Sequence, residues 1–246
     1  HVPVKPNFWL ERGMWTGPGT WNRGIVEAEG ELLVFIDDCS EFPGKDALSL
    51  YWEWYRKGFF ASALCLYNQG GEPLFRDGKR VQDSRWRYVD VVANGICRFP
   101  GQSYYAYSAA SLEAILAVNG WDQNFDGEKT LADVDLGIRL EGIGCKFILD
   151  RRLTAIENAH NAIPSDTLWY EGLPIRSNYE LMRMNRKARR WRANSYTLNG
   201  QEIEWLRTHR EKEDGVPVLE VGSPAYELFT YWVQHQPVFD LREMRL

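Results

Sequence analysis

Residues 31–36, Glu-Leu-Leu-Val-Phe-Ile, form a nearly continuous apolar run that stops abruptly at Asp37 and Asp38. A short apolar run without polar alternation is typical of a strand buried on both faces of a parallel sheet. A helix is expected after it at 44–57, and a second strand at 60–67. Strands that alternate with helices predict an α/β layered domain, with chemistry gathered beyond the carboxyl ends of the strands.

The remaining pattern divides the chain into two parts. Residues 68–85 are polar and rich in glycine, which predicts a hairpin or a mobile loop, and Ser108 is a plausible N-cap. Extended segments are expected at 86–99, 103–107, 146–149 and 154–157, and helices at 20–29, 108–118, 133–142, 166–172, 176–193, 199–213 and 224–234. We therefore expect a core over residues 1–165 and a mainly helical C-terminal extension over 166–246.

Charge and composition exclude some classes of protein. A net charge of −5 over 246 residues argues against a general nucleic-acid binder, because binding to the phosphate backbone needs clustered cations. No apolar run approaches the roughly 20 residues that span a bilayer. The four cysteines are widely spaced in or beside apolar runs, which predicts reduced, buried thiols. A cytoplasmic protein is expected.

The adjacent carboxylates Asp37 and Asp38 have two interpretations. Aspartates favour turns, so they could simply lead into the next helix. A divalent cation is the functional alternative, because Mg²⁺ and Mn²⁺ prefer carboxylates together with phosphate oxygens. The first interpretation needs no ligand; the second predicts a metal site at the end of the strand.

Asp133 and Asp135 begin a predicted helix, where acidic side chains favour the helix dipole without any further role. Two residues apart, they point roughly 200° away from each other and cannot share one task. One could face a cleft while the other pairs with Arg139, four residues on. His160, after the last predicted strand, is either a hydrogen-bonded structural histidine or a ligand that shares a metal with Asp38.

Several short motifs occur in a fixed order along residues 20–160. They are Thr20-Trp21-Asn22-Arg23-Gly24-Ile25, Ala28-Glu29-Gly30-Glu31, the strand into Asp37-Asp38, Asn119-Gly120-Trp121-Asp122, Asp133-Val134-Asp135-Leu136 with Arg139-Leu140, Gly144 and His160. Each is weak alone, but the ordered set is specific. Together they resemble glycosyltransferase family 2.

The resemblance implies a GT-A fold, a Rossmann-like mixed sheet flanked by helices. It also implies roles for particular residues: Asp38 and His160 as ligands of Mn²⁺ or Mg²⁺, Asp37 and Asn22 at the donor, Asp133 as the general base, and Trp121 and Asp122 at the acceptor. The implied reaction moves a sugar, with inversion, from a nucleotide-sugar donor to an acceptor hydroxyl. A uridine-diphosphate sugar is the favoured donor, and the acceptor would be a carbohydrate or a lipid-linked molecule.

The chain departs from the family's pattern in three places, and these departures keep other functions open. Ala132 replaces the family's glutamate, Cys39 replaces the third acidic position, and only 19 residues precede Thr20. One βαβ unit needs about 30 residues, so the family's N-terminal nucleotide-binding strands are expected to be missing. The alternative is a non-catalytic remnant or a carbohydrate-binding module of the same fold. A sugar-phosphate nucleotidyltransferase is a third candidate, although it does not need Asp133 or His160.

A basic cluster lies in the helical extension: Arg183, Arg186, Lys187, Arg189, Arg190 and Arg192. A solvated helix face explains it without a ligand. The alternative is contact with donor phosphates or a peripheral contact with an anionic membrane surface.

Overall fold

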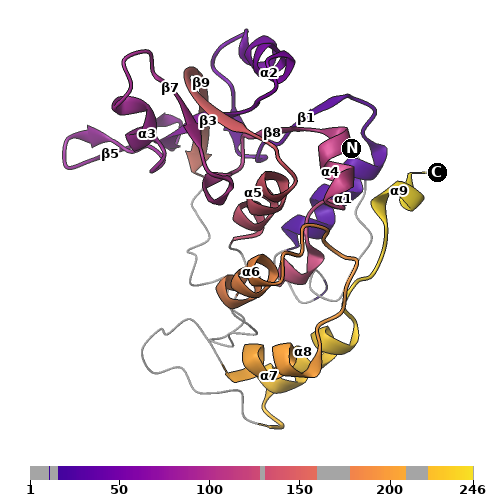
Figure 1. Ribbon diagram of the computed structural model, residues 1–246. Coiled ribbons are helices and arrows are strands. Elements are labelled where there is room, and N and C mark those ends of the chain that lie inside the picture. The colour runs from indigo at the N-terminus through magenta and orange to yellow at the C-terminus, as the bar shows by residue number, and fades with distance from the viewer. Residues whose placement is uncertain (1–10, 12–15, 128–130, 160–177, 209–220, 246) are drawn as a thin grey trace.

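A computed structural model describes residues 11, 16–127, 131–159, 178–208 and 221–245. Over these residues the chain is a mixed α/β protein whose main sheet contains parallel and antiparallel strands and is flanked by helices (Figure 1). The expected α/β class is confirmed at this level. The GT-A type of fold stays a prediction.

Two long strands form the centre of the sheet. β3 (Phe60–Gln69) and β9 (Phe147–Ala159) run parallel, with a register shift between Ser62 and Leu64. The shorter strands pair with them antiparallel: β2 (Ser40–Glu41) and β7 (Ile96–Phe99) with β9, and β4 (Glu72–Pro73) with β3. The two strands predicted at 146–149 and 154–157 are therefore one strand.

The apolar run after Glu31 forms β1 (Leu32–Val34), which pairs antiparallel with β8 (Ala109–Ser111) in a separate two-stranded ladder. All three residues of β1 are only half-buried. The prediction of a parallel strand buried on both faces was wrong here, because an antiparallel pair needs no helix on its second face.

The two faces of β3 contact different cores. Its odd-numbered residues Ala61, Ala63 and Cys65 lie in one apolar cluster, and Leu64 lies in another. Successive side chains of a strand point to opposite faces, so one strand can serve both clusters. The result is a layered arrangement with apolar packing on each side of the sheet.

A different helix covers each of these faces. α2 (Ala47–Arg56) packs through Ala47, Tyr51 and Trp54 against the side of Ala61 and Ala63. α5 (Ala132–Gly142) lies on the opposite side with Leu136 and Leu140 buried (Figure 1). α5 also packs closely on the short helix η2 (Gly101–Ser103).

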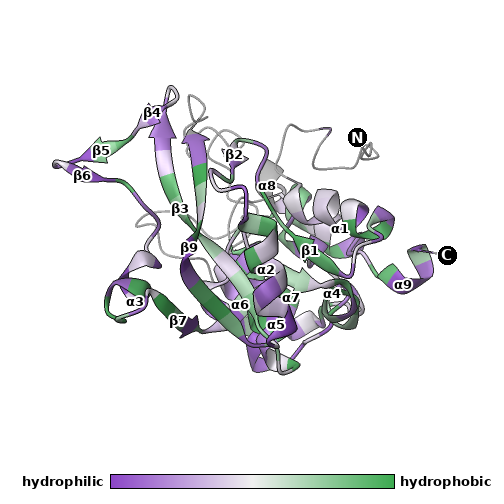
Figure 2. Ribbon diagram, turned by 90° about the horizontal axis from the view of Figure 1, so that it is seen from above, coloured by the Kyte–Doolittle hydropathy of each residue, from purple (hydrophilic) through white to green (hydrophobic). Residues whose placement is uncertain are grey.

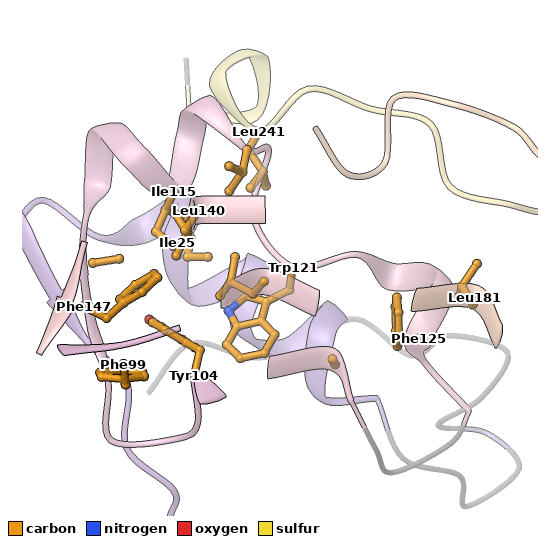
Figure 3. Packing of buried hydrophobic residues seen from close by; sticks show 14 of the residues in the cluster. Ile25, Phe99, Tyr104, Ile115, Trp121, Phe125, Leu140, Phe147, Leu181 and Leu241 are labelled. Atoms are coloured by element: carbon orange, nitrogen blue, oxygen red, sulfur yellow. The ribbon is translucent and has the colours of Figure 1, made fainter. Parts of the chain in front are cut away.

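The C-terminal helices share the α5-side core. They are α6 (Asn178–Lys187), α7 (Gly200–Thr208), α8 (Pro224–Gln234) and α9 (Leu241–Met244). Leu181 and Leu241 belong to the same buried cluster as Trp121 and Phe147 (Figure 3). The predicted boundary at residues 165 and 166 lies outside the described residues, so the two-part division stays a prediction.

Buried hydrogen bonds attach this C-terminal part to the core. The Asn119 side chain donates to the carbonyls of Ala193 and Phe239, each at 2.7 Å, and accepts from the Leu241 N–H at 2.8 Å. Asn194 in turn donates to the Trp121 carbonyl at 2.8 Å. Buried amides with several partners fix relative positions, because an unmade bond there is costly.

Three further α-helices lie in the N-terminal half. α1 (Gly17–Glu27) starts three residues before the helix expected at 20–29, with proline in its first turn. α3 (Trp86–Asp90) is a helix where an extended segment was predicted, and α4 (Leu112–Ala117) is capped by Ser111, not Ser108.

The polar segment 68–85 contains the predicted hairpin. Strands β5 (Phe75–Arg76) and β6 (Lys79–Arg80) pair across Asp77 and Gly78, which both have positive φ. This is the geometry of a tight Asp-Gly hairpin turn. The hairpin projects from the sheet beside β4 (Figure 2).

Candidate functional site

Two carboxylates meet at one tyrosine at the ends of β1 and β9. The Tyr107 hydroxyl lies 2.9 Å from Oε2 of Glu157 and 3.4 Å from Oδ2 of Asp37. Ser40 Oγ lies 2.8 Å from the same hydroxyl. Burial raises the pKa of Tyr107 well above its usual range, so the phenol keeps its proton and can donate it. The Asp37 and Glu157 carboxylates thus share one phenolic donor, and the Ser40 hydroxyl is hydrogen-bonded to the same oxygen.

The backbone at Tyr107 is strained. Its φ is 70°, in the left-handed region that a bulky side chain rarely adopts, although the residue is fully buried. Its N–H donates to the Phe35 carbonyl and its carbonyl accepts from the Ala63 N–H, both at 3.0 Å, and Tyr51 adds a hydroxyl donor. Strain of this kind persists where the surroundings over-determine it, and it is common at functional sites.

Asp133 occupies the first turn of α5, next to this cluster. Leu131 before it has φ 64°, and the Asp133 carboxylate accepts from the Val134 N–H at 2.9 Å. Burial raises the pKa of Asp133 to about 6, and the charge of Asp37 adds to the rise, whereas the backbone N–H groups and Arg85 oppose it. Asp133 remains half-buried and is therefore accessible to solvent. A carboxyl group with this pKa can exchange protons near neutral pH.

Arg85 supplies positive charge beside Asp133. Only 5% of the residue is exposed; its guanidinium pairs with Asp83 at 3.1 Å and donates to the Ala63 carbonyl at 2.8 Å. The same guanidinium stacks on the Tyr105 ring, 5.3 Å from the ring centre. A buried cation held by so many partners is fixed in place.

Three carboxylates act electrostatically on the buried phenol of Tyr105. Burial, with smaller contributions from the charges of Glu157, Asp133 and Asp37, raises the pKa of its phenol to about 12. The hydrogen bond with Tyr67 lowers it only in part. Asp37, Asp133 and Glu157 therefore lie within electrostatic reach of one ring, although they come from three different segments of the chain.

A pocket of about 420 Å³ opens beside Tyr105 and α5. This volume is in the usual range for small-molecule sites. Its walls come from β3, α3, η2 and α5, and its lining includes Tyr67, Arg85, Arg87, Tyr88, Tyr105 and Val134. Val134, the residue after Asp133, lines the pocket, and the charge of Asp133 acts on the lining phenols of Tyr104 and Tyr105.

The predicted metal ligands do not form a cluster over the described residues. Asp38 is exposed, while its neighbour Asp37 contacts Tyr107. His160 lies outside the described part of the chain. Within the residues described, no three His, Cys, Asp or Glu side chains are placed to hold a metal ion. The divalent metal stays a prediction.

The residues predicted at the donor and acceptor contact the protein itself. Asn22 donates to the Trp121 carbonyl at 2.7 Å and accepts from its N–H at 2.8 Å. Trp121 and Asp122 are each 1% exposed, and Asp122 accepts from the Asn185 amide and the Tyr196 hydroxyl. Each of the three thus has a structural role in the core, and their contacts with a donor or an acceptor stay a prediction.

The structure adds functional candidates that the sequence did not indicate: Tyr107, Glu157, Arg85 and Tyr105. Glu157 belongs to a strand and Arg85 to a polar loop, and neither stands in a short motif. Around Arg85 and Tyr105 the sequence shows no helical or strand periodicity of apolar residues that would distinguish them from ordinary surface residues. Only the fold brings them together.

The basic cluster of the extension is partly neutralised. Arg183, Arg190 and Arg192 form ion pairs with Glu180, Glu202 and Asp240. No helix in the described part of the chain is long and apolar enough to cross a membrane. The peripheral membrane contact stays a prediction.

Comparisons with known proteins point away from sugar transfer. No family model matches the chain. The chain is similar to the non-reducing polyketide synthase crz7 of Cladonia metacorallifera, with 30% identity over 35% of this chain and 5% of that protein. It is also similar to the non-reducing polyketide synthase PKS16 of Cladonia grayi, with 35% identity over 21% of this chain and 2% of that protein.

The chain thus spans about one twentieth or less of the length of these curated relatives. Both are named as synthases of polyketides, which is a different enzyme type from a glycosyltransferase. This finding contradicts the prediction that the chain moves a sugar from a nucleotide-sugar donor. Motifs as short as Asp37-Asp38 and Asp133-Val134-Asp135 misled because turns, helix starts and ion pairs favour the same residues.

Proposed function

We propose that this chain catalyses proton transfer on a small, oxygen-rich molecule, with Asp133 as the group that takes and returns the proton. The observation that carries the proposal is the half-buried Asp133 carboxyl, whose pKa is raised to about 6 and whose charge acts on Tyr104 and Tyr105 in the lining of the 420 Å³ pocket. A base with a pKa just below neutrality is mostly ionised at pH 7 and still accepts a proton effectively.

The neighbours of Asp133 suit the charge that such a step creates. When a carboxylate removes a proton from carbon next to a carbonyl, negative charge moves onto the carbonyl oxygen. The Arg85 guanidinium and the phenols of Tyr67 and Tyr105 line the same pocket. A positive charge and hydroxyl donors at these positions would stabilise an oxyanion. Because Asp83 and the Ala63 carbonyl hold Arg85, little reorganisation is needed when the charge forms.

The names of the two relatives suggest the kind of carbonyl compound. A polyketide chain carries carbonyl groups separated by one carbon, and the hydrogens on that carbon are acidic. A carboxylate with a pKa near 6 is a suitable base for them. We therefore propose a 1,3-dicarbonyl compound as the substrate type.

The test is deuterium exchange of ethyl acetoacetate in D₂O, followed by proton NMR at pH 7. We expect the protein to accelerate exchange at the carbon between the carbonyls, and Asp133→Asn to reduce that acceleration about 100-fold. Glu141→Gln is the matched control, since Glu141 is an exposed carboxylate on the same helix. Equal acceleration by Asp133→Asn and the unaltered protein would remove Asp133 from this role.

A further inference from the structure

The pocket beside Asp133 contains an arginine that its surroundings do not neutralise. Arg85 is paired with Asp83, but Arg87 has no carboxylate partner among the described residues. Arg87 is exposed, and its guanidinium contacts the Tyr88 hydroxyl at 3.2 Å and the Tyr88 ring at 5.0 Å from the centre. The Arg87 guanidinium thus lies beside the Tyr88 ring and is open to a ligand.

The other walls of the pocket are rich in aromatic rings. Tyr67, Tyr88, Tyr104 and Tyr105 all line it. Tyr67 and Tyr105 are hydrogen-bonded to each other, and Tyr88 to Arg87 and Ser103. Rings fixed by such bonds give flat apolar surfaces with little loss of conformational freedom when a ligand binds.

We propose that this pocket binds a planar aromatic carboxylate, with Arg87 as the residue that selects the anion and Tyr88 as a stacking surface. A guanidinium matches a carboxylate with two parallel hydrogen bonds, and tyrosine rings favour flat ligands. This inference goes beyond the proposed proton transfer: it concerns which ligand the pocket holds, and that binding can be measured without the reaction.

Three small compounds separate the charge requirement from the shape requirement. Isothermal titration calorimetry with 4-hydroxybenzoate measures the expected ligand. 4-Hydroxybenzamide has the same shape without the charge, and cyclohexanecarboxylate has the charge without the flat ring. We expect 4-hydroxybenzoate to bind about tenfold more tightly than the amide, the ratio that one charge-assisted hydrogen bond supplies. We expect a preference of about the same size over cyclohexanecarboxylate, which cannot stack on a tyrosine ring.

Two variants assign the requirements to residues. Arg87→Gln is expected to remove the preference for the acid over the amide while leaving amide binding unchanged. Tyr88→Leu is expected to remove the preference for the flat ring over cyclohexanecarboxylate. Arg98→Gln is the matched control, because Arg98 stacks on Phe59 from β7 and does not line the pocket. Thermal melting of each variant checks that the fold persists.

The outcomes are decisive for both proposals. Equal affinity for the acid and the amide, an unchanged preference in Arg87→Gln, or no millimolar binding of any of the three compounds overturns the aromatic-carboxylate inference. If that happens while Asp133-dependent exchange of ethyl acetoacetate persists, the proposed function stands without it. If the binding pattern holds but exchange does not depend on Asp133, the pocket is a binding site and the proton-transfer function is wrong.

Discussion

The carboxylates of Asp133 and Asp135 lie two residues apart at the start of α5 and face opposite surroundings. Asp133 is half-buried beside the tyrosine-lined pocket, whereas Asp135 is 1% exposed and bonds Arg139 Nε at 2.7 Å. Helix geometry predicted this division from the spacing alone. The first turn of α5 thus places one carboxyl near the tyrosine-lined pocket and the other in a buried ion pair.

The ion pair is expected to be essential for stability. Arg139 also donates to the carbonyls of Val118 and Gly120, so it remains buried when its partner is removed. Asp135→Asn should lower the free energy of unfolding by about 3–5 kcal/mol, because a buried guanidinium is left without a counter-charge. Urea unfolding at pH 7.5 measures it, with Glu141→Gln as the exposed control. A loss below the control's scatter would contradict the described pairing.

Burial raises the pKa of the Asp133 and Asp135 carboxyls to about 6, but Asp133 has no ion-pair partner among the described residues, so it should affect stability in the opposite direction. Its pKa is raised from 3.8 to about 6 by burial, so the folded state binds the proton more tightly than the unfolded state. The stability that this group contributes is therefore present below about pH 4 and is lost as the pH rises through about 6.

The neutral variant Asp133→Asn should accordingly be more stable than the unaltered protein at pH 7.5, by roughly 1–2 kcal/mol. The difference should shrink toward zero at pH 4. Paired urea titrations from pH 4 to 8 measure it. A variant that is less stable at pH 7.5 would show that the carboxylate is held by favourable partners, and that burial does not dominate.

Close packing between α5 and η2 depends on Gly137. A Cβ at this position would overlap the Gly101 carbonyl and the Tyr104 side chain. Gly137→Ala should cost about 1–3 kcal/mol or more, since a backbone carbonyl cannot move aside easily. Gly24→Ala in α1 is the control: open space surrounds it, and alanine should stabilise the helix by about 0.5–1 kcal/mol. Similar effects from both changes would contradict the packing described.

The attachment of the C-terminal helices depends on Asn119. Its side chain bonds three backbone groups of the C-terminal part, and its φ of 58° is one that asparagine tolerates. Asn119→Ala should lower the free energy of unfolding by about 2–4 kcal/mol and speed amide exchange in α9. Exposed Gln201→Ala serves as the control. Unchanged exchange in α9 would mean that other contacts hold it.

Local pattern was sufficient for the elements that have strong periodicity. The helix at 133–142 and the strand beginning at Phe60 were predicted close to their observed bounds, because each has clear flanking signals. β1 was identified as a strand but given the wrong partners, since pairing direction depends on Ala109–Ser111, more than 70 residues away. The short helix Trp86–Asp90 has too few residues for any period to appear.

The candidate site was predicted only in part, for the same reason. Asp37 and Asp133 stand in recognisable motifs, and both lie within reach of Tyr105. Glu157 became a candidate only because β9 pairs with β3. Tyr107 became one only because of its positive φ just before β8. Long-range pairing and a left-handed φ at a tyrosine leave no trace in local composition.

The pH dependence of Asp133-dependent proton exchange tests the central claim most directly. The rate of ethyl acetoacetate exchange should rise with pH and level off above an apparent pKa of about 6, the value that burial gives Asp133. Asp133→Asn should show no such inflection, while Glu141→Gln should retain it. An inflection near pH 4 in the unaltered protein, or the same profile in Asp133→Asn, would contradict the account.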